Sequence, residues 1–150
     1  MAEIALPETP DPSTPQTRQE RIDYGRSVLD ALNGEIGDRI VHMLEDVSPA
    51  LSEQVMIGFG EIYARPQLSP RDRQLVTIGI LTALGGCESQ LEVHVNNALN
   101  VGLTPDEIVE ALLHSTAYCG FPRALNATTV AKRVFENRGL IASKAEDPAA

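Results

Sequence analysis

The stretch SPRDRQLVTIGILTALGGCESQLEVHVNNALNVG, residues 69–102, decides the fold of this chain. It begins with Ser69-Pro70, a serine cap and a first-turn proline, followed by an almost wholly apolar run, which together predict a helix. The glycine pair Gly85-Gly86 ends that helix. A second helix follows over residues 87–101, where Leu91 and Val95 begin an apolar face at helical spacing.

Helical patterns flank this stretch on both sides. We expect further helices at residues 17–33, 35–47, 48–63, 104–119 and 123–137. No strand or hairpin pattern competes with them, and aromatic residues make up only 4% of the chain, so the core must be aliphatic. The sequence therefore predicts an all-α fold, a single helical domain of six to seven helices over residues 16–139.

The two ends of the chain differ in composition from this helical part. Residues 1–15 contain four prolines and no periodicity, which predicts a flexible arm, or one that lies across a neighbouring subunit. Residues 140–150 are predicted to form a flexible C-terminal tail.

The charge balance limits the classes of partner. Twelve Lys and Arg stand against 21 Asp and Glu, a formal net charge of -9, which argues against a nucleic-acid or an anionic-membrane partner. An anionic substrate would depend on a few locally placed arginines. The chain shows no signal peptide and no spanning segment, and its two cysteines are too few for a disulfide framework. We therefore expect a cytoplasmic protein.

The run LVTIGILTAL, residues 75–84, is apolar on every side of its helix. A helix of this kind is expected to be buried all round, which a small domain rarely achieves with its own chain. The run therefore predicts a homo-oligomer.

Three polar side chains share one side of the helix at residues 87–101. Cys87 and His94 differ by roughly 20° around the helix axis, and Gln90 lies between them. A thiol, an amide and an imidazole in one groove could hold and protonate a small substrate. The alternative is structural, because a cysteine is often a small core residue and a lone histidine is often only hydrogen-bonded.

The motifs GGCESQLEVH, ALNVGLT and AYCGFP, within residues 19–138, resemble the carboxymuconolactone decarboxylase family. The resemblance implies an alkylhydroperoxidase-D-like helical subunit that assembles as a homo-oligomer, a trimer or hexamer. It also implies decarboxylation of 4-carboxymuconolactone to the oxoadipate enol-lactone in aromatic catabolism, without a metal or organic cofactor.

Related alkylhydroperoxidase-D-like proteins reduce peroxides through a Cys-x-x-Cys pair followed by a histidine. This sequence keeps Cys87 and His94 but has Gln90 at the place of the second cysteine. A sulfenic acid at Cys87 would then have no local partner for a disulfide, unless the fold brings Cys119 close. A thiol-dependent peroxide reductase using Cys87 therefore remains an alternative. Recruitment to another small-molecule pathway, or to a non-catalytic binding role, is a further one.

The decarboxylation implied by the resemblance needs an acid, a donor to the developing oxyanion and a cation for the substrate. His94 is the candidate general acid, since its ordinary pKa is about 6.5. Cys87 or Gln90 could polarise the lactone, and Arg73 or Arg123 could bind a carboxylate.

Three more residues complete the candidate site. Gln74 stands near the position where relatives often carry an acid in a proton relay, and Glu61 is its possible substitute in catalysis. Tyr118 is expected to point inward from the helix at residues 104–119, as a substrate-binding residue.

Overall fold

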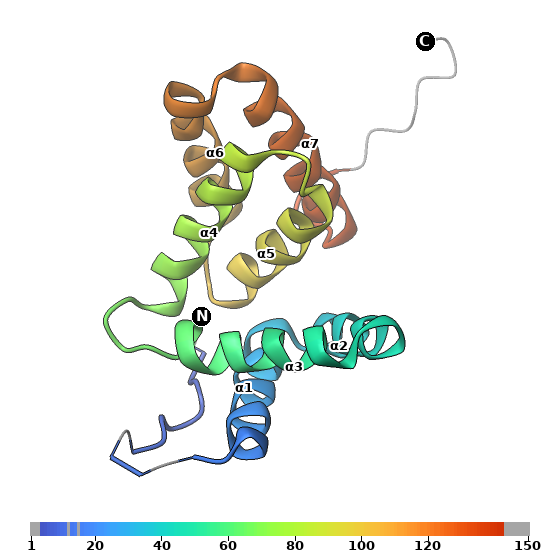
Figure 1. Ribbon diagram of the computed structural model, residues 1–150. Coiled ribbons are helices and arrows are strands. Elements are labelled where there is room, and N and C mark those ends of the chain that lie inside the picture. The colour runs from blue at the N-terminus through green and yellow to red at the C-terminus, as the bar shows by residue number, and fades with distance from the viewer. Residues whose placement is uncertain (1–3, 12, 15, 143–150) are drawn as a thin grey trace. The chain divides into compact units, whose positions relative to one another are not determined.

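The computed structural model describes residues 4–11, 13–14 and 16–142, which form helices and no strand (Figure 1). The helices are α1 (Arg18–Asn33), α2 (Glu35–Val47), α3 (Pro49–Gly58), the π-helix η1 (Phe59–Tyr63), α4 (Pro70–Leu84), α5 (Glu88–Asn100), α6 (Pro105–Cys119) and α7 (Phe121–Asn137). The all-α prediction is confirmed, with seven α-helices in the described part of the chain.

The chain divides into two compact units. One consists of Met1–Gln74 with Asn100–Gly102, and the other of Leu75–Leu99 with Leu103–Ala150. The first unit therefore holds α1, α2, α3 and η1, and the second holds α6, α7 and most of α4 and α5.

The sequence signals for helix starts act as expected at Thr17 and Thr104. Each threonine accepts a hydrogen bond from the backbone N–H three residues later, and the glutamate at that position accepts one from the threonine N–H in return. Two of the N–H groups that have no partner within the helix are thereby satisfied at each helix start.

At the start of α7 the expected boundary is wrong by two residues. Gly120, at φ 78°, makes the chain reversal, so that Phe121 and Pro122 already belong to the helix.

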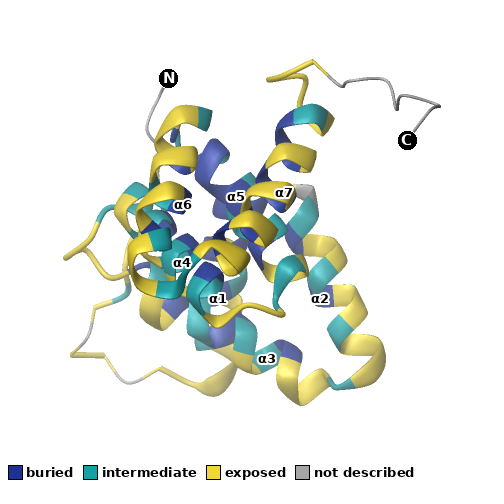
Figure 2. Ribbon diagram, turned by 90° about the horizontal axis from the view of Figure 1, so that it is seen from above, coloured by how far each residue is buried: buried dark blue, intermediate teal, exposed yellow. Residues whose placement is uncertain are grey.

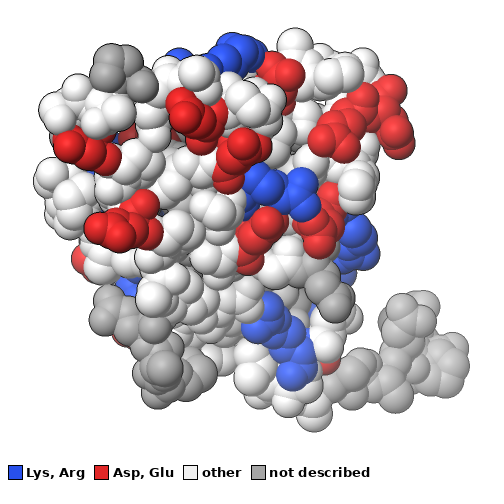
Figure 3. All heavy atoms as spheres, turned by 90° about the horizontal axis from the view of Figure 1, so that it is seen from below, with Lys and Arg blue, Asp and Glu red and all other residues white. Residues whose placement is uncertain are grey.

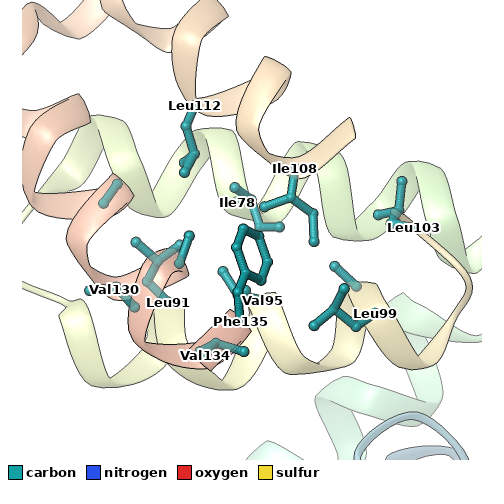
Figure 4. Close-up of a cluster of buried hydrophobic side chains, with 13 residues drawn as sticks. Ile78, Leu91, Val95, Leu99, Leu103, Ile108, Leu112, Val130, Val134 and Phe135 are labelled. Atoms are coloured by element: carbon teal, nitrogen blue, oxygen red, sulfur yellow. The ribbon is translucent and has the colours of Figure 1, made fainter. Parts of the chain in front are cut away.

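The second unit has an aliphatic core with one aromatic ring (Figure 4). The predicted apolar face of α5 supplies Leu91, Val95, Ala98 and Leu99, which are all buried. Side chains from α4, α6 and α7 surround them. These are Ile78, Ile108, Leu112, Ala127, Val130, Ala131, Val134 and Phe135, with Leu103 from the α5–α6 connection.

In the first unit α1 crosses α3 and η1 with almost no space between the backbones. A Cβ atom at Gly25 would lie 1.8 Å from the Met56 carbonyl oxygen. A Cβ atom at Gly60 would lie 3.1 Å from the Gly25 Cα atom. Glycine at Gly25 is therefore a packing requirement, and a side chain at Gly60 would also be crowded. The segment around Gly60 also widens into the π-helix η1.

The apolar helix α4 has two different faces (Figure 2). Gln74, Ile78 and Thr82 are fully or almost fully buried. Val76, Ile80 and Leu84 are 51%, 55% and 63% exposed, which forms an exposed stripe at the spacing i, i+4, i+8. The single chain covers only one face of this helix, so its burial all round, which the sequence analysis expects only with help from a second subunit, stays a prediction. We call Val76, Ile80 and Leu84 the α4 stripe.

The N-terminal arm has no helix or strand in its described residues. Ile4 and Leu6 nevertheless pack against the cluster of Val28, Leu32, Ala64 and Val101. The flexibility of the arm and of the C-terminal tail stays a prediction, and residues 1–3, 12, 15 and 143–150 lie outside the described residues.

The surface is predominantly acidic, as the composition requires. On the face that Figure 3 shows, acidic side chains surround scattered basic ones, which do not gather into a broad patch. Several arginines of α1 are held by acids, such as Arg18 by Glu53 at 2.6 Å and Arg26 by Asp30 at 2.9 Å. Among the described residues, no helix has the length and the apolar character needed to cross a bilayer.

The crossing at Gly25 gives the first prediction. A methyl group there would overlap the Met56 carbonyl group, so we expect Gly25→Ala to lower the free energy of unfolding by about 3 kcal/mol or more. Gly58→Ala is the matched control, because a Cβ atom at this helical glycine has no neighbour within 4 Å. It should be neutral or stabilising by about 0.5 kcal/mol. Urea denaturation measures both variants, and equal stabilities would contradict the close crossing.

Candidate functional site

Cys87 lies immediately before α5, where the chain leaves the glycine pair Gly85-Gly86. Both glycines have positive φ, 65° and 71°, which turns the chain from α4 into α5. The Cys87 carbonyl accepts the Leu91 N–H at 2.9 Å, so Cys87 is the N-cap residue of α5. Its thiol donates to the Leu81 carbonyl at 3.2 Å. Because the thiol has a defined partner and is only partly buried, it is held at the edge of the core.

A small cavity of about 10 Å³ adjoins Cys87, room for roughly one water molecule. It is lined by Leu81, Thr82, Gly85, Cys87, Glu88, Leu91, Arg123, Asn126 and Ala127. The structure therefore brings together two of the predicted site residues, Cys87 from the turn before α5 and Arg123 from α7. A carboxylated lactone needs more space than this cavity offers.

The Arg123 guanidinium is exposed, and it donates a hydrogen bond to the Ala83 carbonyl at the end of α4. That bond holds the cation beside the turn that precedes Cys87. Asn126, three residues later on α7, lines the same cavity and was not predicted from the sequence. A spacing of three residues places the side chains of Arg123 and Asn126 on one face of the helix. This spacing is the sequence feature that could have identified Asn126 as a site residue.

His94 lies on α5, two turns after Cys87. Burial lowers the pKa of His94 from its ordinary value of 6.5 to about 4, because the charged imidazolium loses the solvation that water would give it. At neutral pH the imidazole is therefore neutral. The sequence-based assignment of His94 as an acid rested on the ordinary pKa, which this burial changes.

The expected groove of Cys87, Gln90 and His94 is only partly present in the chain. Gln90 is exposed, whereas Cys87 and His94 are half-buried. Seven residues of helix separate Cys87 from His94 by about 10 Å along the axis, too far for a short thiol–imidazole contact without bending side chains towards each other. Neither Gln90 nor His94 lines the small cavity at Cys87. A substrate would have to bridge the two groups.

The remaining candidates have other surroundings. Glu61 lies on η1 in the first unit and forms an ion pair with Arg21, whose Nε donates at 2.7 Å. The Arg73 guanidinium donates to the Arg65 carbonyl at 2.7 Å, and Gln74 is fully buried. Tyr118 is 81% exposed, so the expectation that it points inward is wrong. Its ring stacks obliquely on His114 with a centroid distance of 5.3 Å.

Metal ligands do not converge in the described part of the chain. No three side chains of His, Cys, Asp or Glu come together there in a way that could hold an ion. Both cysteines are free thiols, and Cys119 donates to the Ser115 carbonyl at 3.1 Å.

The sequence profile described as "Carboxymuconolactone decarboxylase family" matches residues 49–133. A 4-carboxymuconolactone decarboxylase of Acinetobacter baylyi is 40% identical over 87 residues, which is 58% of this chain and 64% of that protein. The nitrosuccinic acid decarboxylase of Metarhizium robertsii is 35% identical over 82 residues, 53% of this chain and 55% of that protein. The chain thus spans less than two thirds of either decarboxylase.

A third similar protein covers more of both chains. An uncharacterized 15.0 kDa protein of Paracoccus denitrificans is 28% identical over 119 residues, 78% of this chain and 89% of that protein. All of the residues around Cys87 and His94, and Arg123 as well, fall inside the matched range 49–133.

The depressed pKa of His94 gives the second prediction. The unfolded chain takes up a proton at this histidine near pH 6.5 and the folded protein only near pH 4. Between these values the unfolded state binds more protons, so the stability falls as the pH is lowered through this window. We expect His94 to account for about 2 kcal/mol of the loss between pH 7 and pH 5.

Urea denaturation at the two pH values measures this loss. His94→Gln should remove that part of the pH dependence, and His42→Gln, at an exposed histidine of α2, should keep it. The same pH dependence in the wild type and in His94→Gln would show that His94 is not desolvated.

Proposed function

Because the chain belongs to the carboxymuconolactone decarboxylase family, whose fold is alkylhydroperoxidase-D-like and all-α, we propose that it decarboxylates a small anionic lactone. The leading substrate is 4-carboxymuconolactone, which would become the oxoadipate enol-lactone and CO2 in aromatic catabolism. The observation that carries this proposal is the 40% identity to the Acinetobacter decarboxylase over 87 residues, together with the family profile's match over residues 49–133, which include Cys87, Gln90 and His94. The two free thiols fit an enzyme of the cytoplasm.

The chemistry of such a substrate explains why an organic cofactor is unnecessary. When the bond from the ring carbon to the carboxylate breaks, its electron pair passes through the conjugated double bond to the lactone carbonyl oxygen. The pair returns when a ring carbon takes up a proton, so that one proton is consumed for each CO2 released. Nitrosuccinic acid, the substrate in the name of the Metarhizium relative, also carries its own electron acceptor, a nitro group. It is the second candidate substrate.

His94 would provide that proton. The neutral resting imidazole gains a proton as the anionic substrate binds, because a negative charge beside it favours the imidazolium and opposes the effect of burial. The imidazolium then transfers this proton to the ring carbon after CO2 has left. His94 would thus be the general acid, and binding of the substrate would protonate it.

Arg123 and Cys87 would act on the other parts of the substrate. The Arg123 guanidinium, held next to Cys87 at the small cavity, is placed to bind a substrate carboxylate. Cys87, or the exposed amide of Gln90, would donate a hydrogen bond to the lactone oxygen as its negative charge grows. Arg73 remains a second candidate for the carboxylate. Gln74 is a candidate for positioning the substrate, and Glu61 for a proton relay.

A peroxide reductase is the second candidate function. The observation that favours it is the free, partly exposed thiol of Cys87, which lines a small cavity together with Arg123. The Gln90 amide in place of a second cysteine counts against it, because it cannot resolve a sulfenic acid. A non-catalytic binding protein of the same fold is the third reading.

Turnover assays give the third prediction. We expect the purified protein to convert 4-carboxymuconolactone and to leave an organic hydroperoxide with a dithiol unchanged. His94→Gln should lower kcat/KM by about 100-fold or more, while His42→Gln should retain the wild-type value. The kcat/KM should also rise as the pH is lowered from 8 to 5, since the proton comes from solution.

Other outcomes of these assays point elsewhere. Lactone turnover that survives His94→Gln would refute the general acid. A kcat/KM that does not change with pH would mean that His94 donates a hydrogen bond while neutral. Peroxide loss that depends on the dithiol and disappears in Cys87→Ser would favour the reductase.

We also propose that the protein works as a homo-oligomer, a trimer or hexamer. The α4 stripe exposes three large apolar side chains in a row, and a single chain leaves a cavity at Cys87 with room for only one water molecule. A second copy covering the stripe would remove apolar area from water and add walls near Gly85 and Cys87. The net charge of -9 gives no support for nucleic acid or an anionic membrane as the partner.

The α4 stripe gives the fourth prediction. Ile80→Asp places a charge in the middle of the stripe, so we expect it to convert the oligomer into monomers of 16.2 kDa. Val47→Asp is the control, because Val47 is also an exposed apolar side chain but lies on α2, outside the stripe. Analytical ultracentrifugation measures the masses. A wild-type protein that sediments as a monomer would contradict the proposal.

A further inference from the structure

A half-open cavity of about 660 Å³ lies within the first unit, and Glu61 is the one residue assigned to decarboxylation among those that line it. Thr9 and Asp11 of the N-terminal arm form one wall, Arg21 and Tyr24 of α1 form another, and Glu61 and Arg65 close the far side. This volume falls in the range of pockets that hold small organic ligands. The ring of Tyr24 and the prolines Pro10 and Pro66 supply its apolar surface.

The charges that line the cavity are not equally available. The Arg21 guanidinium is occupied by the Glu61 carboxylate, with two of its nitrogen atoms in contact with the same oxygen. The Asp11 carboxylate accepts the N–H and the hydroxyl of Ser13 at 2.8 and 2.7 Å. The Arg65 side chain has neither an ion pair nor a hydrogen bond within the described part of the chain. The cavity therefore offers one available cation.

The Tyr24 hydroxyl is a second polar group without a partner among the described residues, on a residue that lines the cavity. Its oxygen is buried and has no hydrogen-bond partner among residues 4–11, 13–14 and 16–142. A buried hydroxyl without a partner costs about 1–3 kcal/mol, which a ligand atom could recover. The far wall includes the π-helix η1, and such a widened turn often occurs at a functional site.

We propose that this cavity is a binding site for a small organic monocarboxylate. The carboxylate pairs with the Arg65 guanidinium, which matches it with two parallel N–H donors. The apolar body of the ligand lies against Tyr24 and the two prolines, and the Tyr24 hydroxyl bonds to a polar atom of the ligand. Because Thr9 and Asp11 line the cavity, a bound ligand contacts the arm directly. This site does not depend on the decarboxylase proposal.

Calorimetric titration with benzoate tests the site, with benzamide as the uncharged probe of the same shape. We expect benzoate to bind with a Kd of about 1 mM or lower and benzamide to bind at least about tenfold more weakly. Arg65→Gln should weaken benzoate binding by about tenfold or more. Arg39→Gln should leave it unchanged, since Arg39 is likewise exposed and without an ion pair in the described chain, but lies outside the cavity. Tyr24→Phe, which removes only the hydroxyl, should weaken binding about threefold.

Amide hydrogen exchange locates the bound probe. Benzoate should slow exchange in the peptide of residues 9–16 and in that of residues 60–67, and not in residues 81–94. Protection confined to residues 81–94 would place the probe at the Cys87 site and overturn the proposal. So would equal losses in Arg65→Gln and Arg39→Gln, or no benzoate binding by the wild type at about 10 mM.

Discussion

Where α1 crosses α3 there is no room for a single methyl group, and much of the first unit follows from that restriction. The Met56 carbonyl occupies the space that a side chain at Gly25 would need, and the backbone of Gly60 also packs closely against Gly25. At this short distance, Arg21 and Tyr24 on α1 lie directly against η1. The ion pair of Arg21 with Glu61 and the walls of the large cavity result from the same approach. A packing constraint between two backbones has thus placed the polar side chains as well.

At His94 desolvation outweighs every other influence on the imidazole. Lowering its pKa from 6.5 to about 4 corresponds to about 3 kcal/mol in favour of the neutral form. Under the proposed mechanism the empty site holds His94 in its neutral form at neutral pH, and a bound anion would have to supply the electrostatic energy that protonates it. The same burial that makes the histidine a poor acid in the empty protein would make it selective for substrates that carry negative charge.

The local features of the fold could be predicted from the sequence because they depend on neighbouring residues. The caps at Thr17 and Thr104, the turn at Gly85-Gly86 and the buried face of α5 all follow from short patterns. Which face of α4 its own chain covers depends on residues far away, and an apolar run carries no information about that. The chemical site was predicted less well than the fold for the same reason.

Contacts between residues far apart in the sequence determine the surroundings of the candidate site residues. The hydrogen bond from Arg123 to the Ala83 carbonyl holds this arginine at the cavity that Cys87 also lines, and nothing in the sequence indicates that the two residues lie close together. Tyr118 was expected to point inward because the buried face of α6 was extended one turn past Ser115, to a position where the core of the second unit has ended. The burial that changes the pKa of His94 is likewise a property of the folded environment, whereas the sequence offers only the ordinary value.

The acidic surface has a kinetic consequence for the capture of any anionic ligand. With a net charge of -9 and acids spread between few bases, the protein repels an approaching anion before Arg123 or Arg65 can attract it. Dissolved salt screens that repulsion over a Debye length of about 8–10 Å, while the close contact with a guanidinium is screened much less. Added salt should therefore speed the encounter, which reverses the usual dependence for enzymes that attract their substrates electrostatically.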